Sequence, residues 1–188
     1  MSQVVSKPVS LLSAEEFFKI PDAEGKQELI EGVVVEMAPP GDEHGEAPLF
    51  LAVFLGPYLK QTGLGSIRTE TGFILRRNPD VVRSPDFAFV SREALKREPK
   101  HNKFRETPPE LAVEILSPEE RPGEVRGKVL DYLQAGSQEV WVCDPKTHTV
   151  VVYLQGGEQH RLMPDDTLTS DLFPGWSCIV EDIFSYLD

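Results

Sequence analysis

The chain has 188 residues, of which 40% are apolar and 27% are charged, so it is long enough to bury the core of a soluble domain. Its net charge of −12 opposes binding of nucleic acid through overall electrostatics, and its two distant cysteines argue against a structural zinc site or a disulfide framework. No apolar run is long enough to cross a membrane, and residues 1–10 lack the apolar stretch of a signal peptide. We therefore expect a cytoplasmic protein with one domain over residues 1–188, ordered from about residue 13, and no membrane partner.

Patterns of apolar and turn residues predict alternating helices and strands. In chain order these are a helix at residues 13–20, a hairpin at 27–37, a helix at 46–62, one or two strands at 63–75, a strand at 85–90, a helix or loop at 91–105, a strand at 110–116, a helix at 123–135, a strand at 139–143, a strand pair at 147–154 and 159–163, and a terminal helix at 181–187. Gly32 marks the expected hairpin turn or bulge, and Gly56-Pro57 is expected to kink or interrupt the second helix. The alternation predicts one α/β domain with a mixed β-sheet flanked by helices.

Two of the predicted strands each carry a single acid among apolar residues. Asp86 is the only charge in the strand at residues 85–90, and Glu114 lies in the middle of the strand at residues 110–116. A carboxylate in such a place is costly unless a cation, a lysine or hydrogen bonds accompany it. The pair therefore indicates half of a metal site. Two simpler interpretations stay open: Asp86 caps a turn after a proline, and Glu114 forms a buried structural ion pair with Lys128.

The helix at residues 123–135 supplies the third part of the predicted site. Its apolar face consists of Val125, Val129, Tyr132 and Leu133. Lys128 lies at the edge of this face, where a long side chain can bury its stem and extend its ammonium group. We expect the helix to pack on the sheet and to bring Lys128 to the two carboxylates, with Tyr132 in the core.

Basic residues gather in one part of this acidic chain. Residues 76–105 contain nine Lys and Arg against four acids, a net charge of +5, which leaves −17 on the remainder. The segment is either solvated surface or a positive strip beside Asp86 that guides a phosphate backbone.

The order of the segments RSPDFAFV, PPELAVEILSPE, K-x3-Y and AGSQEVWVCDP resembles the Uma-two family of proposed restriction endonucleases. That family belongs to the PD-(D/E)XK nuclease superfamily. The resemblance extends from about residue 13 to the end of the chain, and residues 84–145 are its most specific part. It implies a restriction-endonuclease-like fold and a metal-dependent endonuclease that acts on DNA. It also implies Mg²⁺ as cofactor, with Mn²⁺ as a substitute, and we expect a homodimer because a double-strand cut requires two sites.

The resemblance assigns roles to individual residues. Asp86 and Glu114 are the implied metal ligands, and Lys128 is the implied catalytic lysine. In the superfamily this lysine usually stands two positions after the acidic ligand, where this chain has Leu116. The resemblance therefore implies that the lysine has moved to the following helix, as in the Uma-two family.

Four further residues are candidates for the site. Glu28, in ELIEG, resembles an N-terminal acid of the superfamily pattern, which makes it a possible additional metal ligand, and Glu31 is its near equivalent. His44 and Tyr132 are possible accessory residues, although a histidine in a loop is more often a simple hydrogen-bond partner.

The chemistry of phosphodiester hydrolysis matches these residue types. A hard cation held by carboxylates acidifies the attacking water and neutralises the developing charge, and Mg²⁺ needs few protein ligands. The competing hypothesis is a nuclease fold with weak or absent activity that binds nucleic acid or protein. The acidic composition and the lack of a recognition domain favour that hypothesis, whereas the combination of Asp86, Glu114 and Lys128 favours catalysis.

Overall fold

The computed structural model describes residues 11–21, 25–37 and 42–185, without the side chains of residues 42–44. Helices and strands alternate along these ranges as the sequence patterns predict. In chain order the elements are α1 (Ala14–Phe17), β1 (Gln27–Ile30), β2 (Val33–Glu36), α2 (Asp42–Thr62), β3 (Gly65–Arg68), β4 (Phe73–Arg76), β5 (Val81–Arg83), β6 (Phe87–Ser91), α3 (Arg92–Arg97), β7 (Leu111–Ile115), α4 (Pro122–Ala135), β8 (Glu139–Asp144), β9 (Thr149–Leu154), β10 (Gln159–Leu162), β11 (Thr167–Thr169), β12 (Ser177–Ile179) and the 3-10 helix η1 (Glu181–Ile183).

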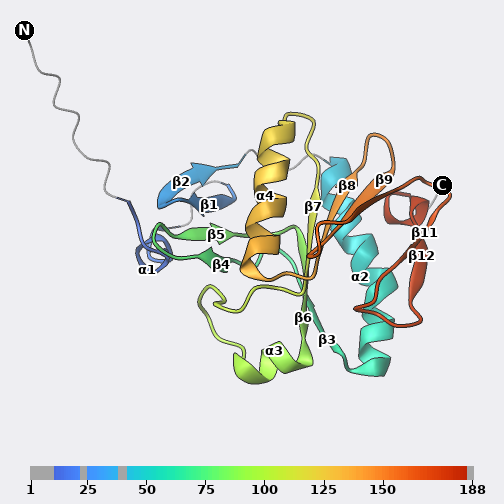
Figure 1. Cartoon of the computed structure of the whole chain (residues 1–188), viewed down its shortest axis with the longest axis horizontal. Helices are drawn as coiled ribbons and strands as arrows, with labels where there is room; N and C mark the ends of the chain where they lie inside the picture. Colours follow the sequence, from blue (N-terminus) through green and yellow to red (C-terminus); the bar gives the residue numbers. More distant parts are fainter. Residues whose placement is uncertain (1–10, 22–24, 38–41, 186–188) are drawn as a thin grey trace, which may run out of the picture.

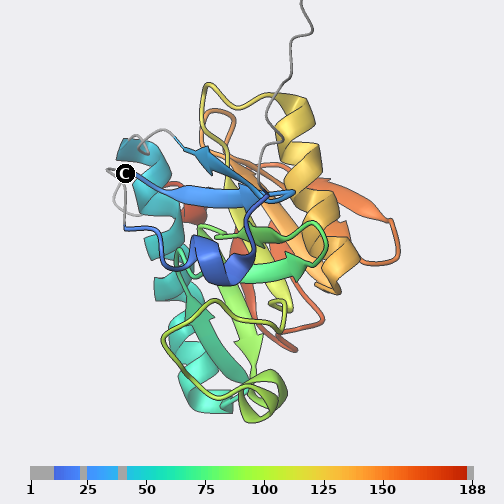
Figure 2. The ribbon, with the colours of Figure 1, turned by 90° about the vertical axis from the view of Figure 1, so that its left-hand side faces the viewer.

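The described strands form a central six-stranded sheet, a four-stranded sheet and a small pair. The strand order of the central sheet is β10-β9-β8-β7-β6-β3, and that of the four-stranded sheet is β2-β1-β5-β4. In the central sheet β7 and β8 are parallel and connected through α4, whereas the other neighbours are antiparallel. The helices α2 and α4 cover opposite faces of this sheet (Figures 1 and 2). The predicted fold class, a mixed sheet flanked by helices, is thus confirmed.

Side chains of β7 alternate between the two layers of the core. Leu111, Val113 and Ile115 belong to the cluster that packs beneath α2. Ala112 belongs to the cluster beneath α4, so Glu114, two residues further along the strand, faces the same helix. The strand at the centre of the sheet therefore presents its one carboxylate to α4.

The hairpin formed by β1 and β2, called here the N-terminal hairpin, turns at Glu31 and Gly32. Both residues have positive φ, 52° and 78°, as a two-residue hairpin turn requires. The hairpin pairs with β5 through Leu29 and Val82. Because β5 leads to Asp86, this pairing places the beginning of β1 beside that acid.

Several elements differ from the prediction in extent. Asp86 precedes β6 instead of lying within it, since the three residues after β5 form the link between the two larger sheets. α2 begins at Asp42 and continues through Pro57 without a break, although a proline cannot donate the usual helical hydrogen bond. Leu51 and Leu55 before the proline and Leu59 after it pack into the core and hold the helix on the sheet.

At the end of the chain the predicted helix is a 3-10 turn in the described residues, and β5, β11 and β12 were not predicted. In the described ranges no helix combines the length and the apolar character that a membrane span needs.

A candidate metal and catalytic site

Asp86 is held at the junction of the two larger sheets. Its Oδ2 atom accepts a hydrogen bond of 2.8 Å from the backbone N–H of Ile115, the residue that follows Glu114 on β7. The side chain is buried, with 6% of Asp86 exposed. This bond ties Asp86, the residue before β6, to the end of β7, where Glu114 precedes Ile115.

Glu114 accepts hydrogen bonds from two residues of α4. Its Oε2 atom is 2.9 Å from Nζ of Lys128, and its Oε1 atom is 2.8 Å from the hydroxyl oxygen of Tyr132, which donates. Lys128 and Tyr132 are one helical turn apart, so both project from the same face of α4. The helix thus supplies both a cation and a neutral donor to one carboxylate, of which 1% is exposed.

Electrostatics keep Lys128 charged. Burial lowers its pKa, but the carboxylates of Glu114 and Glu120 outweigh this effect and raise it; Glu120 Oε1 is 2.6 Å from Nζ. Burial raises the pKa of Glu114 to about 7, with Lys128 opposing the rise and Asp86 and Glu28 adding to it. Because Lys128 pairs with two acids, it remains an ammonium even when Glu114 takes up a proton.

Lys26 is a residue of the site that the sequence did not reveal. It directly precedes β1, and its Nζ atom donates to Asp86 Oδ1 at 2.8 Å. The side chain is 20% exposed. A lysine next to Gly25 in a turn is typical of solvated surface. The one feature of the sequence that could have indicated a role in the site is its position just before the strand that carries Glu28.

The structure separates the two N-terminal acids. Glu28 is 1% exposed and accepts hydrogen bonds from Arg83 Nη1 at 2.7 Å and from the backbone N–H of Ser84 at 3.1 Å. Glu31 is exposed in the hairpin turn and pairs with Arg76 at 2.9 Å. Glu28 therefore borders the site, whereas Glu31 lies at the surface. His44 falls in the first turn of α2, and its side chain lies outside the described residues.

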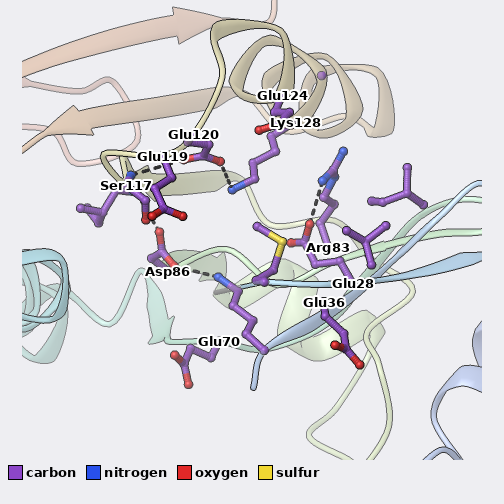
Figure 3. Close-up of a pocket in the computed structure, with 16 residues that line it drawn as sticks. Glu28, Glu36, Glu70, Arg83, Asp86, Ser117, Glu119, Glu120, Glu124 and Lys128 are labelled. Carbon is purple, nitrogen blue, oxygen red and sulfur yellow. Dashed lines mark hydrogen bonds and ion pairs between the residues drawn. The ribbon is translucent and has the colours of Figure 1, made fainter. Parts of the chain in front are cut away.

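Lys26, Glu28, Asp86 and Lys128 line a cavity of about 440 Å³ between the N-terminal hairpin, the end of β7 and α4 (Figure 3). Among the described residues its wall carries seven carboxylates and three cations, the latter being Lys26, Arg83 and Lys128. Figure 3 shows Lys128 extending from α4 toward Glu120, with Asp86 on the opposite side. The cavity is therefore acidic, and a phosphate group could approach it only with further positive charge.

The donor set can be compared with what a divalent cation needs. In the described part of the chain no group of three His, Cys, Asp or Glu side chains converges closely enough to hold a metal ion. Asp86 and Glu114 are nevertheless hard oxygen donors on adjoining positions, and Asp86 already contacts a cation in the ammonium of Lys26. Two carboxylates completed by water molecules fit Mg²⁺, which retains part of its hydration shell in proteins.

A model of the Uma2 family, described as "putative restriction endonuclease", matches residues 14–181. The chain belongs to this family. A crystal structure of "a putative nuclease belonging to DUF820" from Anabaena variabilis matches this Uma2 protein with a TM-score of 0.82 at 23% identity, covering 93% of this chain and 98% of that chain. This likeness shows a shared fold, and no curated protein matches the sequence. Family and fold together support a nuclease-like function for the Uma2 protein.

The basic residues of α3 do not lie beside Asp86, although Arg83 of the same positive segment lines the cavity. Asp86 precedes β6 and α3 follows it, so the five residues of β6 separate them by about 17 Å. Figure 1 shows α3 at the far end of β6 from α4. The strand direction, which the sequence does not reveal, places the lysines of α3 away from the cavity.

Proposed function

We propose that this protein is a metal-dependent endonuclease that hydrolyses DNA phosphodiester bonds in the acidic cavity. The observation that carries the proposal is the convergence of three residues from separate segments. Asp86 is tied to β7 through the N–H of Ile115, and Lys128 reaches Glu114 on the same strand. The family and the shared nuclease fold support the reaction class, and DNA follows as the substrate of a restriction endonuclease.

Asp86 and Glu114 are the proposed ligands of Mg²⁺, with Mn²⁺ as a substitute. Glu28 is the proposed third ligand, and to serve as one it would have to release the N–H of Ser84 or Arg83. When bound, the cation would supply a more acidic attacking water and positive charge for the oxygens around phosphorus.

Lys128 has the charge and the position to act on the reacting groups. An ammonium has three N–H donors, and in the described structure that of Lys128 donates to Glu114 and forms an ion pair with Glu120. A remaining N–H can donate to the attacking water or to a phosphate oxygen, and the positive charge would stabilise the transition state. Tyr132 fixes the orientation of Glu114 through its hydroxyl group, which makes it a positioning residue.

The open cavity favours catalysis over a purely structural ion pair. A structural pair would be equally well served in a sealed core, whereas Asp86 and Lys128 both line a space that can admit a ligand. We further propose that residues 1–188 act as one domain with one site. Two copies would then combine as a homodimer for a double-strand cut.

The proposal is tested by nicking of plasmid DNA in Mg²⁺ or Mn²⁺. Asp86→Asn and Glu114→Gln should abolish both nicking and calorimetric binding of Mn²⁺. Glu36→Gln is the matched control, because Glu36 is an exposed carboxylate of the same cavity wall and should leave nicking unchanged. Circular dichroism checks that each variant is folded.

Lys128 needs a design that separates catalysis from stability. Lys128→Met leaves Glu114 buried without its cation, which costs about 3–5 kcal/mol of folding free energy. The double variant Glu114→Gln with Lys128→Met removes both charges and should recover the fold without recovering activity. A folded double variant that nicks DNA at the parent rate would reject this site, whereas a folded parent that does not nick DNA would favour a binding module.

A further inference from the structure

Lys26 is a half-buried charged group that the proposed reaction does not use. Its Nζ atom lies 2.8 Å from Asp86 Oδ1, and the residue lines the cavity. The backbone of Lys26 is fixed, since its carbonyl oxygen accepts the N–H of Met37 at 2.8 Å across the N-terminal hairpin. The ammonium of Lys26 can therefore move only by rotation of its flexible side chain.

The ammonium of Lys26 lies where the negative charge of the site is concentrated. Burial lowers the pKa of Lys26, but the carboxylates of Asp86, Glu114 and Glu28 together raise it above its ordinary value. One cation thus offsets part of the charge of three acids. Without such a cation, like-charged carboxylates in a buried site repel each other.

We propose that Lys26 is the resident counter-ion of the metal site, and that its ammonium leaves Asp86 when a divalent cation binds there. The inference rests on the proposed metal-dependent function. Two cations that compete for one carboxylate oxygen bind it at each other's expense. Lys26 therefore weakens metal binding and stabilises the protein when metal is absent.

The two lysines of the cavity differ in a way that suits these separate roles. Lys128 is held between Glu114 and Glu120 and projects from the middle of a helix. Lys26 is the residue before β1, outside any helix or strand. Its ammonium donates a hydrogen bond to Asp86, a proposed metal ligand. The cavity wall also includes Glu36 and Glu70, so a displaced ammonium has other acids to approach (Figure 3).

The test is the Mn²⁺ affinity of the full-length chain, measured by calorimetry for the parent and for Lys26→Met. We expect the affinity to rise about tenfold or more in the variant, because a unit charge close to the site is removed. In EDTA the variant should melt below the parent, and Mn²⁺ should raise its melting temperature by more than it raises that of the parent. Lys26→Gln, whose amide can still donate to Asp86, serves if Lys26→Met does not fold.

The control is Lys96→Met, an exposed lysine of α3 at the far end of β6, which changes the net charge equally. It should bind Mn²⁺ as the parent does, and an equal gain in this control would overturn the inference. Unchanged or lower affinity in both Lys26 variants, with the parent binding Mn²⁺, would overturn it and leave the proposed function standing. Binding by the variant alone would support it, whereas no binding by either protein would reject both.

Discussion

Buried charge at the site is balanced residue by residue. Each of three buried acids has a cation within 2.9 Å: Glu28 has Arg83, Asp86 has Lys26, and Glu114 has Lys128. A lone buried carboxylate would be costly, and it would take up a proton instead. The pairing explains how a chain with a net charge of −12 retains several acids in its interior. It also means that replacing one partner of a pair leaves the other charge buried and unpaired, which lowers the free energy of unfolding.

Glu98 shows the same principle away from the site. Its carboxylate accepts the backbone N–H groups of Glu106 and Thr107 at 3.0 and 2.8 Å, and it contacts His101 and Arg105. Burial raises its pKa, but these hydrogen bonds, first that of Glu106, outweigh burial and lower the pKa from 4.5 to about 2. The stability that Glu98 contributes is therefore fully present above pH 4.5 and is lost as the pH falls through about 2.

We expect Glu98→Gln to lower the free energy of unfolding by about 1–3 kcal/mol at neutral pH, because the amide cannot accept all the donors that the carboxylate accepts. The difference between variant and parent should shrink as the pH falls from 4.5 toward 2. Urea unfolding at several pH values measures it. A difference that is constant over this range would show that the charge of Glu98 plays no part.

At the scale of elements, the close approach of strands depends on small residues. β3 pairs with β6 at the edge of the central sheet, with Gly65 opposite Ser91. A Cβ atom on Gly65 would lie 2.3 Å from the carbonyl oxygen of Val90 and 2.6 Å from the ring of Phe89. The first contact is with backbone, which cannot move without shifting the strand.

Gly65→Ala should therefore destabilise the protein by about 1–3 kcal/mol through this overlap. The matched control is Gly127→Ala in α4, where a Cβ atom meets nothing within 4 Å. Alanine in a helix interior should raise stability by about 0.5–1 kcal/mol. Thermal unfolding of the two variants measures both effects, and equal changes in them would contradict the steric explanation.

At the scale of the whole molecule, ion pairs neutralise part of the positive segment at residues 76–105. In the described residues four of its arginines form ion pairs: Arg76 with Glu31, Arg77 with Glu15, Arg83 with Glu28, and Arg105 with Glu98. The exposed lysines and arginines on and after α3 form a further positive surface, at the far end of β6 from the cavity. Overall charge therefore gives DNA little attraction to the cavity unless a divalent cation is present.

Replacing Lys96, Arg97 and Lys100 by Gln should leave plasmid nicking and Mn²⁺ affinity unchanged, because these residues lie about 17 Å or more from Asp86. Surface substitutions of this kind also change stability little. Nicking rates of the triple variant and the parent, measured over a series of salt concentrations, provide the test. A slower rate with a flatter salt dependence would show that bound DNA extends from the cavity to α3.

The sequence predicts the part of the site that follows from periodicity. Alternation along β7 assigns Glu114 to one face of the strand, and helical spacing assigns Lys128 to the side of α4 that covers it. Lys26 could not be found in this way, because it meets Asp86 only through the pairing of β1 with β5. β5 itself has three residues, too few for an alternating pattern to be recognised. Contacts between segments 60 residues apart carry no local signal.

The N-terminal hairpin has a consequence for the order of events during synthesis. Lys26 and Glu28 leave the ribosome early, whereas their partners Asp86, Arg83 and Asp131 emerge later. The proposed site residues therefore all precede β8, while Trp141, Phe173 and Trp176 of the core beneath α2 come afterwards. A nascent chain that ends after α4 contains the proposed site residues but lacks the part of this core that β8 and the later elements supply. Newly made protein should thus acquire its charged cavity only when the elements that follow α4 have been translated.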